Sequence, residues 1–99
     1  MRVIKELVDH IKDEIEGALE YANKYAEYKV LGSPRASTYK QMAYDELSHA
    51  DKIHEFAVEE IQKARAVMTP PVEMEEKWEH EHKKYIEDVA KIKMMLEKS

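Results

Sequence analysis

Hydrophobic side chains recur at three- and four-residue steps through three long segments, a spacing typical of helices that bury one face. The stripe of the first segment consists of Leu7, Ile11, Ala18, Tyr21, Tyr25 and Tyr28. The stripe of the second consists of Tyr39, Met42, Ala43, Ala50, Ile53, Ala57, Ile61 and Ala64. The stripe of the third consists of Trp78, Tyr85, Val89, Ile92 and Leu96. The pattern therefore predicts an all-α protein.

Two breaks separate these segments. The run from Leu31 to Pro34 places glycine, serine and proline in order, which suits a left-handed helix end, an N-cap and a first helical residue. The run from Met68 to Pro71 offers Thr69 as an N-cap and contains two prolines that cannot continue the preceding helix. Both breaks predict short connections between neighbouring helices.

The expected helices cover about residues 2–31, 34–67 and 70–98. Each is then a rod of about 40 to 50 Å, because an α-helix rises 1.5 Å per residue. We expect a long antiparallel hairpin followed by a third helix, in a single domain over residues 1–99.

Composition narrows the classes of function. Charged residues make up 37% of the chain, and glycine and proline are scarce, which disfavours a many-turned β protein. Since there is no cysteine, disulfides, thiolate metal sites and iron–sulfur clusters are excluded, and any metal must be held by histidine and carboxylates. The net charge of −5 opposes binding to nucleic acid or to anionic membranes. No stretch approaches the roughly 20 apolar residues of a membrane span, so we expect a cytoplasmic protein.

Two glutamates interrupt the hydrophobic stripes. Glu14 lies within the first stripe, and Glu46 lies at the centre of the second, with His49 about 60° away around the helix. A carboxylate that faces a helix–helix core loses hydration and must be protonated, paired or metal-bound. Neither stripe offers a lysine or arginine nearby. Glu46 and His49 are spaced i,i+3, so both side chains are within reach of a single metal ion.

Helical rise brings these three side chains to a similar height. Glu14 precedes Gly32 by 18 residues, which corresponds to about 27 Å. Glu46 and His49 follow Ser33 by 13 and 16 residues, which corresponds to about 20 and 24 Å. We therefore expect the three groups to meet across an antiparallel hairpin.

The segments Glu14-Ile-Glu-Gly-Ala-Leu-Glu-Tyr21 and Asp45-Glu-Leu-Ser-His-Ala50 carry a family resemblance that covers about residues 7–60. Here the chain resembles the ferritin-like superfamily of ferritins, rubrerythrins and encapsulated ferritins, and most of all the short encapsulated ferritins, whose metal site forms between subunits. The resemblance implies that Glu14, Glu46 and His49 are iron ligands and that Tyr21 is a near-site aromatic residue. It also implies ferrous oxidation with dioxygen or peroxide as the acceptor.

A di-iron centre in a four-helix bundle takes one glutamate from each of two helices and one Glu-x-x-His pair from each of the other two. One chain provides half of this set. We therefore expect a homodimer or higher homo-oligomer that completes a ferritin-like four-helix bundle and holds two iron ions per dimer, with manganese or zinc as alternatives. Tyr21 and Tyr39 each lie seven residues from a ligand and are candidates to hydrogen-bond a coordinating carboxylate.

The third segment contains a second Glu-x-x-His pair, Glu79 and His82, which would place a metal site within one chain. Glu79, however, lies about 100° from the centre of its helix's hydrophobic stripe. Otherwise His80 and His82 are expected to form a surface or interface pair, and His10 and His54 to occupy solvated or edge positions.

Two functions remain open. The first is a metal-dependent, ferroxidase-type oxidoreductase. The second is a non-catalytic helical oligomerisation or adaptor module with a structural metal or none. In a metal-free core of the second kind, Glu14 would hydrogen-bond His49 and either Tyr21 or Tyr39.

Overall fold

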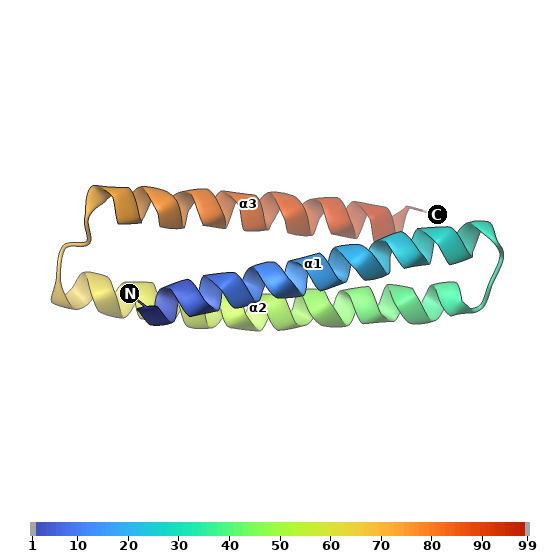
Figure 1. The fold of residues 1–99 in the computed structure, drawn as a ribbon, viewed down its shortest axis with the longest axis horizontal. Coiled ribbons are helices and arrows are strands. Elements are labelled where there is room, and N and C mark those ends of the chain that lie inside the picture. The colour runs from blue at the N-terminus through green and yellow to red at the C-terminus, as the bar shows by residue number, and fades with distance from the viewer. Residues whose placement is uncertain (1, 99) are drawn as a thin grey trace.

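The computed structural model of the chain describes residues 2–98. It contains three α-helices, α1 (Arg2–Val30), α2 (Arg35–Val67) and α3 (Val72–Glu97), and no strand within residues 2–98. Each helix runs antiparallel to the one before it, in a rod measuring 55 × 17 × 15 Å (Figure 1). The prediction of an all-α fold with a hairpin and a third helix is confirmed. None of the described helices combines the length and apolar character needed to cross a bilayer.

The α1–α2 turn uses the residues that the sequence indicated. Gly32 adopts a φ of 67°, a left-handed conformation that favours glycine. Its amide donates to the Lys29 carbonyl at 3.0 Å, and the Ser33 amide donates to the Tyr28 carbonyl at 2.9 Å. These two bonds form a Schellman motif, which satisfies the last carbonyls of α1. The Arg35 amide donates to Ser33 Oγ at 3.2 Å, so Ser33 caps α2 as predicted.

The α2–α3 connection differs from the prediction. α3 begins at Val72, two residues later than expected, and Thr69 does not cap it. Pro71 has a ψ of 148°, and its carbonyl accepts hydrogen bonds from the amides of Met74 and Glu75 at 3.0 and 3.1 Å. A residue that precedes proline is restricted from the helical region, so the first of two prolines cannot start a helix. The expected N-cap at Thr69 was therefore wrong.

The core lies mainly between α1 and α2, which pack along their whole length. Four alanines at this interface, Ala18, Ala22, Ala43 and Ala50, are fully buried, and their small side chains allow the two helices to approach closely. α3 packs chiefly against α1 and touches α2 at few points. Its buried hydrophobic residues are Ile92 and Leu96, near its C-terminal end. The C-terminal half of α3 is thus the part anchored to the hairpin.

α3 covers only one side of the hairpin. On α1, Lys12 pairs with Glu81 of α3 at 3.2 Å. Glu14 follows two residues later and therefore projects about 200° away around α1. On α2, His54 contacts α3. His49 lies about 140° away from His54 around α2. Glu14 and His49 thus lie on the side of the hairpin that α3 leaves open.

Candidate metal centre

Glu14, Glu46 and His49 meet midway along the hairpin. Each offers one ligand atom, and these atoms all lie within 4.8 Å of one another. His49 Nδ1 lies 3.4 Å from Glu14 Oε2. Within residues 2–98, no other three side chains of metal-ligating type are grouped in this way. The convergence expected from helical rise is therefore present in the structure.

Gly17 provides the space that the Glu46 side chain occupies. A Cβ atom at Gly17 would lie 3.2 Å from Glu46 Oε2 and 3.5 Å from its Cδ, so the carboxyl group rests directly against the backbone of α1. The sequence analysis did not single out this residue. The sequence offered one sign of its role: a glycine inside a helix destabilises that helix by about 0.5–1 kcal/mol relative to alanine, so its presence indicates a position where a side chain would not fit.

His10 is a second neighbour of the cluster that the sequence analysis missed. Its side chain is exposed, in agreement with the expected edge position, yet its Nε2 lies 3.2 Å from Glu14 Oε1. The two residues are spaced i,i+4 and therefore face each other along α1. His10 engages one oxygen of Glu14 and leaves the other directed at Glu46 and His49.

That other oxygen lacks a hydrogen-bond partner. The Glu14 side chain is only 17% exposed, and its Oε2 atom is buried and unsatisfied. The 3.4 Å approach of His49 Nδ1 does not have hydrogen-bond geometry. As two carboxylates, Glu14 and Glu46 have no hydrogen to offer each other. Oε2 therefore requires either a proton carried by Glu46 or a cation.

The electrostatics agree with this requirement. A proton shared in a hydrogen bond between the two carboxyl groups lowers the pKa of Glu14 and raises the pKa of Glu46. Burial disfavours the ionised form of a carboxyl group, so it opposes the lowering of the Glu14 pKa and adds to the raising of the Glu46 pKa. Two adjacent carboxyl groups that favour sharing one proton form a site where a cation can take the place of that proton.

The donor set fits a transition-metal dication. Two carboxylates and one imidazole suit iron, manganese or zinc, whereas calcium and magnesium prefer oxygen ligands alone. Gly17 leaves room for Glu46, and the unsatisfied Glu14 Oε2 lies beside His49. The residues present therefore match the metal that the ferritin-like resemblance implies.

Tyr21 and Tyr39 form part of an aromatic cluster between the helices. Their ring centroids lie 6.1 Å apart, and Tyr28 stacks on Tyr39 with centroids 5.4 Å apart and planes 2° from parallel. Within residues 2–98, neither hydroxyl hydrogen-bonds Glu14 or Glu46. Their expected role as partners of a coordinating carboxylate stays a prediction.

The structure keeps Glu79 and His82 apart from the cluster, because both lie on α3. Glu79 pairs with Lys83 at 3.8 Å. His82 instead contacts His54 of α2, with 3.0 Å between their ring nitrogens. His54 was expected at a solvated or edge position but is half-buried between the two helices. The sequence did not indicate this contact, since it depends on how α3 is rotated against the hairpin.

Comparison with known proteins yields no match. No family model fits the chain, and neither a curated protein nor a solved structure is similar to it. The metal centre is therefore inferred from the positions of Glu14, Glu46 and His49.

Proposed function

We propose that Glu14, Glu46 and His49 form half of a two-metal centre, that a second copy of the chain completes it, and that the protein is a ferroxidase-type oxidoreductase. The observation that carries this proposal is the buried Glu14 Oε2 atom, which has no hydrogen-bond partner and lies in a cluster of three ligand atoms within 4.8 Å. Leaving such an oxygen unpaired is costly, and a shared cation removes that cost.

The need for a second copy follows from the number of ligands. One chain offers three ligand residues at this cluster, whereas a di-iron centre uses four carboxylates and two imidazoles. The cluster faces the side of the hairpin that α3 does not cover. Phe56, two turns after His49 on nearly the same line of α2, is 53% exposed there. An exposed aromatic residue beside an incomplete site favours a symmetric contact between copies.

Each neighbouring residue has a distinct role in this proposal. Glu14 and Glu46 compensate the positive charge of the ions, and His49 supplies a neutral nitrogen donor. His10 holds Oε1 of Glu14, so that Oε2 keeps its direction toward the cluster. Metal competes with the proton that Glu46 holds more tightly than an ordinary glutamate does, so metal binding should be pH-dependent. Bound as a ferrous pair, iron would supply two electrons to dioxygen or peroxide.

The experiment combines metal analysis with the measurement of oligomeric state. We expect a dimer or larger assembly that binds about two iron ions per dimer at this centre and oxidises ferrous iron in the presence of dioxygen or peroxide. Glu14→Ala and Glu46→Ala should each abolish this iron binding and the oxidation. Glu20→Ala, which removes an exposed acid of α1, is the matched control and should change neither. Ferrous iron bound to Glu46→Ala at an undiminished stoichiometry, or oxidised by it at an undiminished rate, would refute the proposed centre.

The alternative is a non-catalytic helical oligomerisation or adaptor module with a structural metal or none. One observation favours it: a single proton between Glu14 and Glu46 satisfies the cluster without metal, in line with the raised pKa of Glu46. A well-folded assembly that oxidises ferrous iron only at the background rate would support this module.

A further inference from the structure

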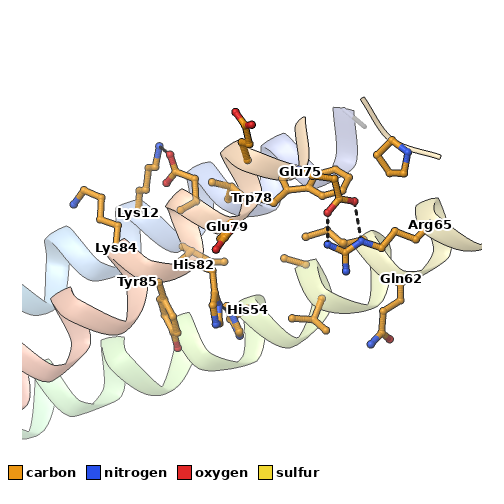
Figure 2. Close-up of a pocket in the computed structure, with 18 of the residues that line it drawn as sticks. Lys12, His54, Gln62, Arg65, Glu75, Trp78, Glu79, His82, Lys84 and Tyr85 are labelled. Carbon is orange, nitrogen blue, oxygen red and sulfur yellow. Dashed lines mark hydrogen bonds and ion pairs between the residues drawn. The ribbon is translucent and has the colours of Figure 1, made fainter. Parts of the chain in front are cut away.

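A groove separates the N-terminal half of α3 from the hairpin, with a volume of about 950 Å³. Its apolar wall includes Val8, Ile11, Ile15, Ala57, Ile61 and Trp78. At one end, Arg65 of α2 pairs with Glu75 of α3 at 2.8 Å (Figure 2). At the other end lie His54, His82 and Tyr85 (Figure 2). The two histidines come from different helices and belong to no part of the cluster around Glu14.

The two imidazoles are held facing each other. His54 Nε2 lies 3.0 Å from His82 Nδ1. Tyr85 stacks on the His54 ring, with centroids 4.5 Å apart and planes 6° from parallel. The Tyr85 hydroxyl donates to Asp51 at 3.4 Å. The stacking and this hydrogen bond restrict rotation of the His54 ring, so its Nε2 stays directed at α3.

The separation of the two nitrogens is close to that of two ligands on one metal ion. With metal–nitrogen distances of 2.0–2.1 Å and tetrahedral angles, two ligand nitrogens lie about 3.3 Å apart. The observed 3.0 Å differs from this by a few tenths of an ångström. Without metal, one of the two nitrogens must carry a hydrogen for the other to accept; a bound ion would replace that hydrogen and lie to one side of the line that joins the two nitrogens.

We infer that His54 and His82 form a second metal site, a two-imidazole chelate for zinc or copper(II) that joins α2 to α3. Imidazole nitrogens without a carboxylate favour these late transition metals over the oxygen-preferring ions. His82 is exposed and the groove is adjacent, so water can fill the remaining coordination positions.

The surroundings favour this chelate over binding to a carboxylate. Burial and the neighbouring His82 lower the pKa of His54, and the charges of Asp51 and Glu55 oppose this change. Two acids that line the groove are paired with lysines: Glu81 pairs with Lys12 at 3.2 Å, and Asp88 pairs with Lys84 at 2.8 Å. Since the backbones of α2 and α3 approach each other at few points, an ion here would add to the Arg65–Glu75 pair in holding α3 against the hairpin.

The test uses the full-length chain that carries Glu46→Ala and His49→Ala, so its outcome does not depend on the proposed two-metal centre. In this background we expect one zinc ion per chain by calorimetric titration. Zinc at ten times its dissociation constant should raise the melting temperature by about 6–11 °C. Bound copper(II) should show coupling to two imidazole nitrogens in its electron paramagnetic resonance spectrum.

Adding His82→Ala or His54→Ala to this background should weaken zinc binding at least about 100-fold, because each removes one of two ligands. His82 is exposed, so its replacement by alanine leaves the fold intact, and helicity by circular dichroism verifies this. His80→Ala is the matched control: it removes an exposed histidine of the same helix and should change nothing. Absence of zinc binding in the background protein, or equal binding after His82→Ala, would overturn the site and leave the pair as a hydrogen bond only.

Discussion

Replacing Gly17 by alanine should stabilise the fold while weakening the candidate metal centre. Glycine inside a helix is less favourable than alanine by about 0.5–1 kcal/mol, because its backbone loses more conformational freedom on folding. The added Cβ would lie 3.2 Å from Glu46 Oε2 and 3.5 Å from its Cδ. Ordinary contacts between such atoms begin at about 3.5 Å, so the Glu46 carboxyl group must move by a few tenths of an ångström.

The two effects have opposite signs because different parts of the molecule respond. The atom that must move is the end of a flexible side chain, so the movement costs the fold little. We therefore expect the free energy of unfolding to rise by about 0.5–1 kcal/mol and the melting temperature by about 2–8 °C. The displaced Glu46 carboxylate no longer meets Glu14 and His49 in the same geometry, and metal affinity should fall about tenfold.

Thermal denaturation with a chelator measures the first effect, and titration of the metal-free protein with ferrous iron in the absence of dioxygen measures the second. Asn23→Ala is the matched control, because Asn23 is exposed on the same helix and alanine is the better helix former there too. It should raise stability without changing metal affinity. Unchanged metal affinity in Gly17→Ala would show that the contact between Glu46 and α1 is irrelevant to binding. Lowered stability would show that Glu46 cannot move aside.

Three further predictions concern pH and packing. In the metal-free protein, the raised pKa of Glu46 means that the folded state holds the Glu46 proton more tightly than the unfolded state does. The resulting contribution to folding stability is present below pH 4.5 and is lost as pH rises through the raised pKa. Melting temperatures measured against pH should show this loss relative to Glu46→Gln, whose amide donates to Glu14 at every pH. Ile92→Ala should lower the free energy of unfolding by about 2–5 kcal/mol in chemical denaturation, because Ile92 is 1% exposed. Ile86→Ala, at a position that is 53% exposed, should change the free energy of unfolding by no more than about 0.5 kcal/mol. Burial raises the pKa of Tyr85 from 10.0 to about 12, so folding stability should fall as pH rises between these two values. The melting temperature of the wild-type protein should therefore decrease over this range by more than that of Tyr85→Phe.

The parts of the fold that could be predicted are those that local rules decide. Gly32 and Ser33 set the α1–α2 turn through backbone conformation and capping, both of which depend on the residue type. Because helices rise by a constant amount per residue, a turn located in sequence also fixes which residues lie opposite each other. The convergence of Glu14, Glu46 and His49 followed from this arithmetic together with their places on or beside the hydrophobic stripes.

The parts that could not be predicted depend on the placement of α3. Its rotation about its own axis and its tilt against the hairpin are set by tertiary packing, which periodicity within α3 does not fix. For this reason the contact between His54 and His82 had no sequence signal. The role of Gly17 was missed for a related reason, since a close approach between helices leaves no pattern beyond the glycine itself.

Ligand number, rather than charge, is the stronger argument for the proposed dimer. Two carboxylates from one chain already balance the charge of one dication, so charge alone does not call for a partner. Glu14, Glu46 and His49 nevertheless give only three ligand residues, fewer than the four of a closed zinc site. In the proposed dimer, two chains related by a twofold axis would share six such residues between two ions. Because α3 packs on the opposite side of the hairpin, it would not lie between the two clusters.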